Sequence, residues 1–388
     1  MLPFSSTRKV NSGAAESPSI RSYFYVGGHY VDDGKGDGQH VLTGQLYVEQ
    51  LLSVDDWNFA FREKDLKTSK RKETVLANHV QVHQKPFDYS SENRAYCFPQ
   101  NFLNTPEGRK GWASWLLDQG YIVYLLDQTC RGRSSYHPSS GSTITYPAEL
   151  AEKRWTACRD FLLWPEAALH TQWPGSGRIG DPIFDTYYAS TVPSLTDYGA
   201  EQALMRAAGI CLLDRIGPAI LVTHSQGGTH GWLWADARPE LVKAIVAIEP
   251  AGPPFQSTIV KGPMVKLYGI TDIPLSYEPP ADQMLSDGRP LQTQEHLSAN
   301  GGKYILQKEP ARRLTNLLKI PVLLETGEAS SHAAYDEFTV SFLRQAGVNV
   351  EHLRLAEKGI HGNGHLQFLE MNNLEIIELL EKWITAIA

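Results

Sequence analysis

Short apolar runs alternate with helical segments along most of this chain, and this alternation restricts the fold more than any other feature. The runs that have the length of buried strands are residues 121–126, 219–223, 244–248 and 321–324, and a further strand is expected near 350–355. Apolar residues at helical spacing occur at 111–119, around Trp232 and Trp234, at 338–346 and at about 374–387. Strands and helices in this order predict an α/β fold with an open, mostly parallel, doubly wound sheet. Ligands of such sheets bind at the carboxyl ends of the strands.

Two parts of the chain depart from this alternation. Residues 23–28 and 46–50 flank a segment rich in Gly and Asp, and they predict an antiparallel hairpin at the N-terminal edge of the sheet. Residues from about 136 to 198 are rich in Pro, Ser and Trp, so we expect a lid-like insertion over the sheet there. We expect a disordered N-terminus at 1–20 and a single domain over 21–388.

The composition excludes several classes of protein. Hydrophobic residues make up 42% and charged residues 20% of the chain, which is typical of a globular protein. The net charge of −7 is spread along the chain, and the basic run at 67–72 is short, so no nucleic acid partner is expected. Four cysteines without a CxxC pair argue against a zinc site and a disulfide framework.

The sequence also bears on location and assembly. The first twenty residues lack the apolar core of a secretory signal, and no apolar stretch is long enough to span a membrane. We therefore expect a cytoplasmic protein without a membrane partner. A homodimer is compatible with the sequence.

The segment 224–228, with the sequence HSQGG, follows a predicted buried strand and begins a predicted helix. A serine in this context is typical of a nucleophile elbow, a sharp turn that places its hydroxyl above the edge of the sheet. The N–H of Gln226 is then the first donor to a developing oxyanion. Thr223 departs from the small residue that is usual two positions before the serine. The alternative is that Ser225 only caps the helix.

A carboxylate ends the next predicted strand, at Glu249. An acidic side chain after an otherwise apolar strand needs a partner, because burial of an unpaired charge is costly. A histidine would supply that partner, so we predict Glu249 as the acid that orients the catalytic base. Glu325 and Glu328, at the end of the run at 321–324, and Asp336 are the alternatives.

The segment 361–365, with the sequence HGNGH, lies between the last predicted strand and the last predicted helix. Two histidines in such a loop are hard to explain by packing alone. We predict His365 as the general base, and His361 as a residue that lines the pocket. The order Ser, acid, His is that of α/β-hydrolases. A metal site at the two histidines is the alternative, but no further ligand has suitable spacing, so no metal and no organic cofactor is expected.

With these motifs, the chain resembles a group of fungal and bacterial α/β-hydrolases, which includes an atypical bacterial esterase with a glutamate after its sixth strand. The resemblance covers most of the chain. The matching segments are 24–28, 105–109, 111–112, 127–128, 131–134, 225–226, 246–250 and 361–365. In that family the serine, this glutamate and the second histidine form a catalytic triad. The resemblance therefore implies a triad of Ser225, Glu249 and His365.

One segment departs from the pattern of the family. Relatives have a strand that ends in a His-Gly motif before the Asn-Thr-Pro segment at 104–106, and the loop after that strand donates the second oxyanion N–H. Residues 74–99 of this chain are polar and show no clear buried strand. We therefore look for the second donor in the backbone around Phe98 to Phe102.

These residues support three hypotheses. In the first, Ser225 attacks an apolar ester or lactone while His365 takes its proton, and water releases the acyl group. In the second, which follows from a resemblance to fungal hydrolase-like proteins of fusarin- and cytochalasan-type pathways, the same pair serves a tailoring or ring-forming step on a polyketide-derived substrate. In the third, the chain is a binding protein with a degenerate oxyanion hole. We favour the first. Aromatic residues of the insertion, such as Trp155, Trp164 and Trp173, fit an apolar pocket as well as core packing.

Overall fold

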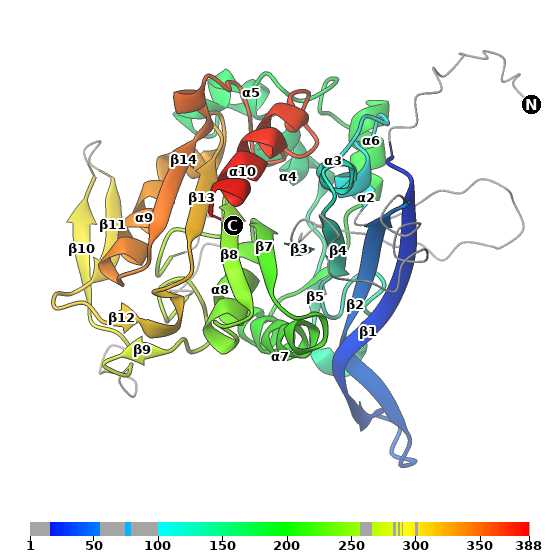
Figure 1. Cartoon of the computed structure of the whole chain (residues 1–388), viewed down its shortest axis with the longest axis vertical. Coiled ribbons are helices and arrows are strands. Elements are labelled where there is room, and N and C mark those ends of the chain that lie inside the picture. The colour runs from blue at the N-terminus through cyan, green and yellow to red at the C-terminus, as the bar shows by residue number, and fades with distance from the viewer. Residues whose placement is uncertain are drawn as a thin grey trace, which may run out of the picture.

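The computed structural model describes residues 16–54, 74–78, 100–256, 266–281, 285, 288, 290–298 and 302–387. Within these residues a twisted sheet crosses the molecule, with helices on both faces (Figure 1). Its strands, in spatial order, are β1 (Ser19–Asp32), β2 (His40–Ser53), β4 (Ile122–Asp127), β3 (Thr74–Asn78), β7 (Ala219–His224), β8 (Val242–Ile248), β13 (Val322–Thr326) and β14 (Val350–Arg354). All neighbouring pairs from β4 to β14 are parallel. The predicted mostly parallel, doubly wound sheet is confirmed.

The two faces of the sheet carry separate apolar cores, because successive side chains of a strand point to opposite faces. In β7, Leu221 belongs to one core, whereas Ile220 and Val222 belong to the other. The first core lies under helices α7 (Tyr198–Ile216), α8 (Gly227–Ala237) and α9 (Asp336–Gln345). The second lies under α3 (Trp112–Asp118) and α10 (Asn373–Ile387). No helix among the described residues is long and apolar enough to cross a membrane.

The N-terminal hairpin is confirmed and is longer than predicted. Strands β1 and β2 pair antiparallel from Ser19↔Ser53 to Asp32↔His40. The predicted disordered segment 1–20 extends too far, because Ser17 is buried and its hydroxyl donates to the carbonyl of Ser114 at 2.9 Å. Residues 1–15 lie outside the described residues.

The prediction that residues 74–99 contain no buried strand is wrong for the first five of them. Strand β3 lies between β4 and β7, and Val75 is fully buried beside Val123 and Ile220. Charged and polar residues precede and follow this short run, so its apolar character is hard to see without the neighbouring strands. Residues 79–99, which include Phe98, lie outside the described residues.

We call residues 136–198 the cap. Its ends meet in a short antiparallel pair, β5 (Thr143–Ile144) with β6 (Ser194–Leu195). Between them are α4 (Ala148–Ala151), a π-helical turn (Glu152–Thr156), α5 (Cys158–Phe161), a 3₁₀ turn (Pro165–Leu169) and α6 (Pro182–Ala189). Trp155 and Trp173 are buried, and Trp173 packs edge-on against Tyr187 at 5.6 Å between ring centroids. These aromatic residues therefore belong to the second core of the sheet. Movement of the cap as a lid stays a prediction.

The irregular region after β8 forms small accessory elements. β9 (Tyr277–Glu278) pairs with β12 (Arg313–Leu314), and β10 (Thr293–Leu297) pairs with β11 (Lys303–Gln307). The hairpin of β10 and β11 lies beside α9 at the edge of the molecule (Figure 1). α2 (Gln100–Leu103) precedes α3.

Helices α7 and α8 pack closely at a glycine, and this contact gives a prediction about stability. A Cβ atom at Gly209 would lie 1.9 Å from Nε1 of Trp234, which donates a hydrogen bond to the carbonyl of Met205. Gly209→Ala is therefore expected to destabilise the fold by about 1–3 kcal/mol. Thermal unfolding should show a lower Tm, whereas Ala207→Ser, at an exposed site of the same helix, should change it little. An unchanged Tm for Gly209→Ala would contradict this packing.

Candidate active site

Ser225 lies at a sharp turn between β7 and α8. Its backbone has φ of 55°, a conformation that non-glycine residues adopt rarely and often at functional sites. The neighbouring strand end holds this turn, because the Ser225 N–H donates to Ile248 and the Ser225 carbonyl accepts from Ala251. A Cβ at Gly228 would lie 2.5 Å from Cβ of Pro250, so only glycine fits there. This is the geometry of a nucleophile elbow.

The structure also accommodates the unusual Thr223. A Cβ atom at Gly231, one turn further along α8, would lie 3.0 Å from Cγ2 of Thr223. Gly231 therefore supplies the space that a small residue at position 223 would otherwise leave. The strand and the helix still pack closely, because the small residue is in the helix, at Gly231, rather than in the strand, at position 223.

The three residues that the sequence singled out as a triad lie side by side. Nε2 of His365 is 3.0 Å from Oγ of Ser225, and Nδ1 of His365 is 2.5 Å from Oε2 of Glu249. Ser225 follows β7 and Glu249 follows β8, so both lie at the carboxyl ends of neighbouring parallel strands. A hydroxyl, an imidazole and a carboxylate in this order can activate the hydroxyl as a nucleophile.

Glu249 is fully buried and is held by several donors besides His365. The N–H of Gly327 donates to Oε1 at 2.9 Å, the hydroxyl of Ser330 donates to Oε2 at 2.7 Å, and Gln367 donates to Oε1 at 3.3 Å. Burial raises the pKa of this carboxyl, whereas the charge of His332 and the hydrogen bonds from Ser330 and Gly327 oppose the rise. These donors stabilise the ionised form that an orienting acid requires.

Glu325, one of the alternative acids, lies in β13 beside Glu249 and does not contact His365. Gln367 donates to both carboxyl groups, at 2.8 Å to Glu325. Burial, followed by the negative charge of Glu249, raises the pKa of Glu325 well above its ordinary value. The neutral form is therefore favoured more strongly for Glu325 than for Glu249, which accepts hydrogen bonds from more donors.

The backbone and the charge state of His365 are both set by the residues around it. Nε2 of His224, the residue before the serine, lies 2.8 Å from the carbonyl oxygen of His365, which ties the histidine loop to the elbow. Burial lowers the pKa of the His365 imidazole well below its ordinary value, and the charges of His332 and Arg154 lower it further. A neutral imidazole is the form that can accept a proton from serine.

The remaining predicted residues have different surroundings. Gln226 is the N-cap residue directly before α8, and none of the described residues accepts a hydrogen bond from its backbone N–H. The side chain of His361 is mostly exposed, and its ring lies 3.1 Å from Glu328, another of the alternative acids. His361 is therefore not brought together with Ser225 and His365. Asp336 contacts His332 and not His365.

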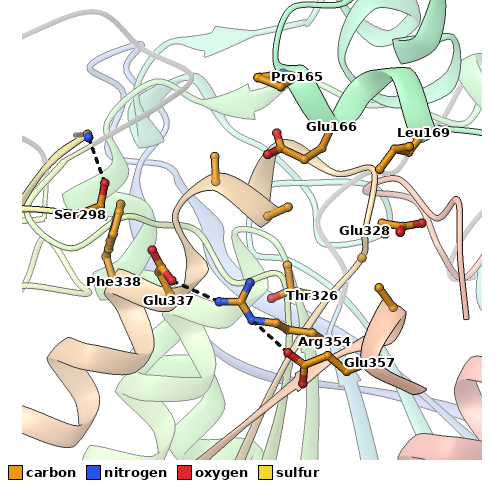
Figure 2. Close-up of a pocket in the computed structure, with 15 residues that line it drawn as sticks. Pro165, Glu166, Leu169, Ser298, Thr326, Glu328, Glu337, Phe338, Arg354 and Glu357 are labelled. Atoms are coloured by element: carbon orange, nitrogen blue, oxygen red, sulfur yellow. Dashed lines mark hydrogen bonds and ion pairs between the residues drawn. The ribbon is translucent and has the colours of Figure 1, made fainter. Parts of the chain in front are cut away.

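A cleft of about 600 Å³ lies beside the loop that follows β13 (Figure 2). Its walls come from the 3₁₀ turn of the cap, α9, the ends of β13 and β14, and the hairpin of β10 and β11. Glu328 lines it, and Arg354 lies there with Glu337 at 3.2 Å. Neither Ser225 nor His365 is among its lining residues, so this cleft adjoins the serine site without enclosing it.

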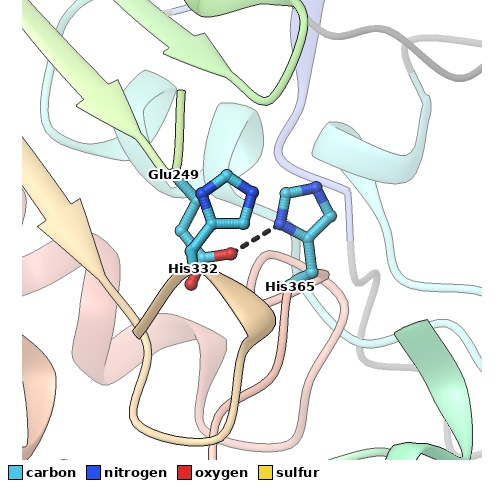
Figure 3. A group of neighbouring side chains, drawn as sticks. All are labelled: Glu249, His332 and His365. Atoms are coloured by element: carbon cyan, nitrogen blue, oxygen red, sulfur yellow. Dashed lines mark hydrogen bonds and ion pairs between the residues drawn. The ribbon is translucent and has the colours of Figure 1, made fainter. Parts of the chain in front are cut away.

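His332 is the site residue that sequence reasoning missed. It lies in a 3₁₀ turn (Ser331–Ala334), is almost fully buried, and stacks on His365 with 4.8 Å between ring centroids and 9° between planes (Figure 3). Its Nδ1 is 3.0 Å from Oδ1 of Asp336. The spacing of His332 and Asp336, four residues apart before a helix, is the signal that could have pointed to it.

Glu249, His332 and His365 are also a group with the chemistry of metal ligands. Their ligand atoms lie within 4.8 Å of one another, and among the described residues no other such group of three occurs. Glu249 and His365 already bond each other, and His361, which the metal alternative needed, does not belong to the group. The expectation that no metal or cofactor is needed stays a prediction.

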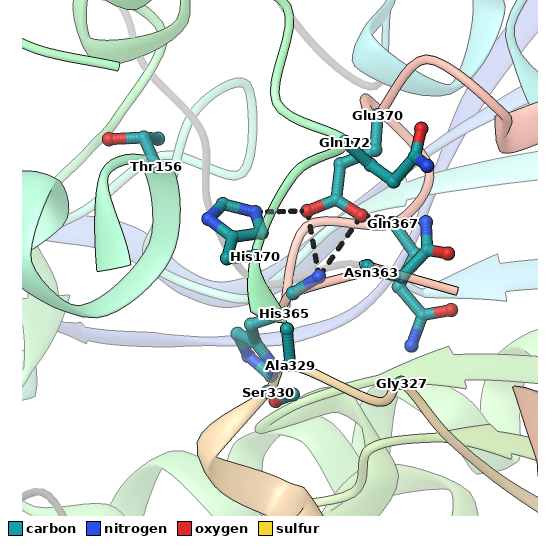
Figure 4. Close-up of polar contacts among 12 residues, drawn as sticks. Thr156, His170, Gln172, Gly327, Ala329, Ser330, Asn363, His365, Gln367 and Glu370 are labelled. Atoms are coloured by element: carbon teal, nitrogen blue, oxygen red, sulfur yellow. Dashed lines mark hydrogen bonds and ion pairs between the residues drawn. The ribbon is translucent and has the colours of Figure 1, made fainter. Parts of the chain in front are cut away.

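Another buried carboxylate, that of Glu370, holds the loop that carries His365. Oε1 of Glu370 accepts from the N–H of Gly364 at 2.9 Å and lies 2.8 Å from Nε2 of His170 in the cap (Figure 4). Its Oε2 accepts from Asn363 at 2.8 Å. Further bonds join the cap to the same loop, from the Thr171 N–H to the Gly362 carbonyl and from the side chain of Gln172 to the His361 carbonyl.

The cap is bonded to the acid side of the site as well. The indole N–H of Trp164 donates to the carbonyl of Ala329 at 3.0 Å, close to Ser330, which contacts Glu249. The N–H of Ala329 in turn donates to the carbonyl of Asn363. The loop after β13, the histidine loop and residues 164–172 of the cap therefore form one connected unit.

The fold is that of an α/β-hydrolase, and comparison with known proteins agrees. A probable secreted lipase, phiG, of a fungal species (strain ATCC 74256) is 47% identical over 288 residues, which cover 73% of this chain and 78% of the relative. A structure described as a novel bacterial esterase has a TM-score of 0.56 and 18% identity, and the match covers 98% of this chain and 99% of that one. No family model matches the sequence.

The chain belongs to the α/β-hydrolase superfamily, and the family resemblance predicted from the sequence is confirmed. It is an enzyme of the carboxylic ester hydrolase type.

Proposed function

We propose that this enzyme cleaves carboxylic esters through an acyl-enzyme on Ser225, with His365 as the general base and Glu249 as the acid that orients it. The observation that carries the proposal is the unbroken chain of contacts from Oγ of Ser225 through both ring nitrogens of His365 to Glu249. Each contact is within hydrogen-bonding distance, and the serine has the strained turn of an elbow.

The steps follow from this geometry. Oγ of Ser225 attacks the ester carbonyl carbon while its proton passes to Nε2 of His365. When the carbon–oxygen bond to the alcohol breaks, His365 returns that proton to the leaving alkoxide. Water then enters, gives a proton to His365, attacks the acyl carbon and releases the acid, and the proton returns to Ser225. Glu249 stabilises the imidazolium through Nδ1 and keeps Nε2 directed at the serine.

The oxyanion needs preorganised donors, and the N–H of Gln226 at the start of α8 is the first. β3 ends at Asn78, which pairs with Thr223 of β7. This is the same sheet edge as the elbow, and it is where the family places the strand that precedes its second donor. A second donor in the backbone around residues 98–102 stays a prediction; of that range, Phe102 is in α2 and its ring stacks on Phe368.

The substrate class proposed is an apolar acyl ester or lactone. Support comes from the name of the fungal relative, which is called a lipase. A tailoring or ring-forming step on a polyketide-derived substrate stays the second hypothesis. The cytoplasmic location and the absence of nucleic acid and membrane partners also stay predictions, and the fungal relative is named as secreted. Fractionation of the producing cells and their medium would decide the location.

A fluorophosphonate probe tests the serine directly. Intact-protein mass spectrometry of the folded enzyme should show one added phosphonyl group, and peptide mapping should place it on Ser225. Heat-denatured enzyme and the variant Ser341→Ala, which removes a half-buried serine of α9, are the controls: the first should not react and the second should react fully. Folded wild-type enzyme that takes up no probe would contradict the proposed acyl-enzyme and favour a binding role.

A further inference from the structure

Two histidine–carboxylate pairs lie face to face in this site. The first joins His365 to Glu249, and the second joins His332 to Asp336. The two imidazole rings are nearly parallel, at 9° and 4.8 Å between centroids (Figure 3). The mechanism above uses only the first pair, so the second needs its own explanation.

We propose that His332, held by Asp336, is a positioning residue that fixes the plane of the His365 imidazole and opposes its protonation before serine attack. This inference rests on the proposed function, because it assigns His332 a role toward the base of that mechanism. It adds a residue that neither the sequence motifs nor the comparisons single out.

The position of His332 is itself well determined. Asp336 is fully buried, and its second oxygen accepts from the hydroxyl of Thr326 at 2.9 Å. The backbone N–H of His332 donates to Oγ of Ser330, whose hydroxyl donates to Glu249. Both acids and both rings thus share one network, and a shift of His332 would move the partners of His365 as well.

The stacking restricts rotation of the catalytic ring. His365 also meets His224, at 4.5 Å between centroids and an interplanar angle of 36°. Because two rings contact His365, its imidazole is held with Nε2 toward Ser225 even when no substrate is bound. Such support from surrounding residues keeps catalytic side chains in productive geometry.

The charge of His332 opposes protonation of His365. Burial lowers the pKa of His332, but the carboxylates of Asp336 and Glu249 outweigh burial and raise it above its ordinary value. A positive charge stacked on His365 disfavours a second positive charge on that ring. The charged and titratable groups that face the two rings are Glu249, Asp336, Lys266, Arg154 and His224.

The pH dependence of kcat/KM tests this role. The reaction needs neutral His365, so kcat/KM falls at low pH as His365 takes up a proton. His332→Phe keeps an aromatic ring but removes the charge, so the pKa of His365 should rise and the acid limb should move to higher pH. We expect a shift of about one pH unit. Asp336→Asn, which weakens protonation of His332, should move the limb in the same direction by less.

His296→Phe is the matched control, because His296 also stacks on a ring, that of Tyr304, in the outlying hairpin. Its acid limb should coincide with that of the wild type. A His332→Phe enzyme with an unmoved acid limb would overturn the proposal, whether or not its plateau rate is lower. Fluorophosphonate labelling at high pH separates this result from failure of the proposed function, since Ser225 of His332→Phe should still react.

If both variants misfold, nitrogen-15 NMR of histidine-labelled wild-type enzyme still tests the proposal, because it measures the order in which His332 and His365 are protonated. As the pH falls, the ring of His332 should already be protonated when His365 begins to take up a proton. The reverse order, with His365 protonated first, would overturn the proposal.

Discussion

Replacement of Ser225 by alanine is expected to lower kcat/KM for a reactive acyl ester by about 10⁴- to 10⁶-fold, without loss of the fold. The expected loss is large because the nucleophile itself is removed, while the first oxyanion donor and the neighbouring residues stay in place. His365→Ala should lower kcat/KM by about the same factor, since a serine without its base is a poor nucleophile. Steady-state hydrolysis of a chromogenic ester, with circular dichroism to check folding, measures both.

The double variant gives the sharper test. If Ser225 and His365 act as one unit, Ser225→Ala combined with His365→Ala should be no slower than either single variant, because the second change removes nothing further. Losses that multiply in the double variant would show that the two residues act independently. That result would contradict the mechanism even if each single variant were slow.

Glu249→Gln is expected to lower kcat by about 10³- to 10⁴-fold, with a smaller effect on KM. The amide cannot stabilise the imidazolium of His365, and its NH₂ group would face the donors Gly327 and Ser330 or the ring itself. The expected change is therefore in the chemical step. Single-turnover measurement of acyl-enzyme formation checks it.

The neighbouring Glu325 supplies the control for that experiment. Because burial and the charge of Glu249 raise its pKa and favour the neutral carboxyl, which resembles an amide, Glu325→Gln should change kcat only a few-fold. Equal losses of kcat in the two variants would show that the negative charge needed for catalysis is shared by Glu249 and Glu325 rather than carried by Glu249 alone. A larger loss for Glu325→Gln would identify Glu325, the alternative considered from the sequence, as the orienting acid.

Much of the fold could be predicted because its signals are local. The apolar runs of β4, β7, β8 and β13 are nearly continuous, as strands buried on both faces should be, whereas β14 at the edge of the sheet alternates. β3 escaped prediction because a five-residue strand between polar segments gains its stability from β4 and β7, which the sequence does not place beside it. The long helix α7 was also not predicted, since its apolar residues are spread around the helix.

The residues of the candidate site also differ in whether a local sequence signal marks them. Ser225, Glu249 and His365 each stand next to a recognisable element, a strand end or a glycine-rich loop, and the structure brings the three together. His361 belongs to the same motif, but its neighbours direct it to Glu328 and to solvent. His332 could not be predicted, because no motif surrounds it and only the folded loop places its ring on His365.

The bonds between the cap and the two catalytic loops have a consequence for how the sequence can vary. Thr171 lies so close to Gly362 that a Cβ on the glycine would meet its hydroxyl at 2.0 Å, and a Cβ on Gly364 would meet His170 at 2.8 Å. Residues 170–172 and 361–364 are distant in the chain, yet neither can change shape alone. Among relatives we expect these two stretches to be inherited as a matched set, so a cap exchanged between enzymes should function only when its partner loop is exchanged with it.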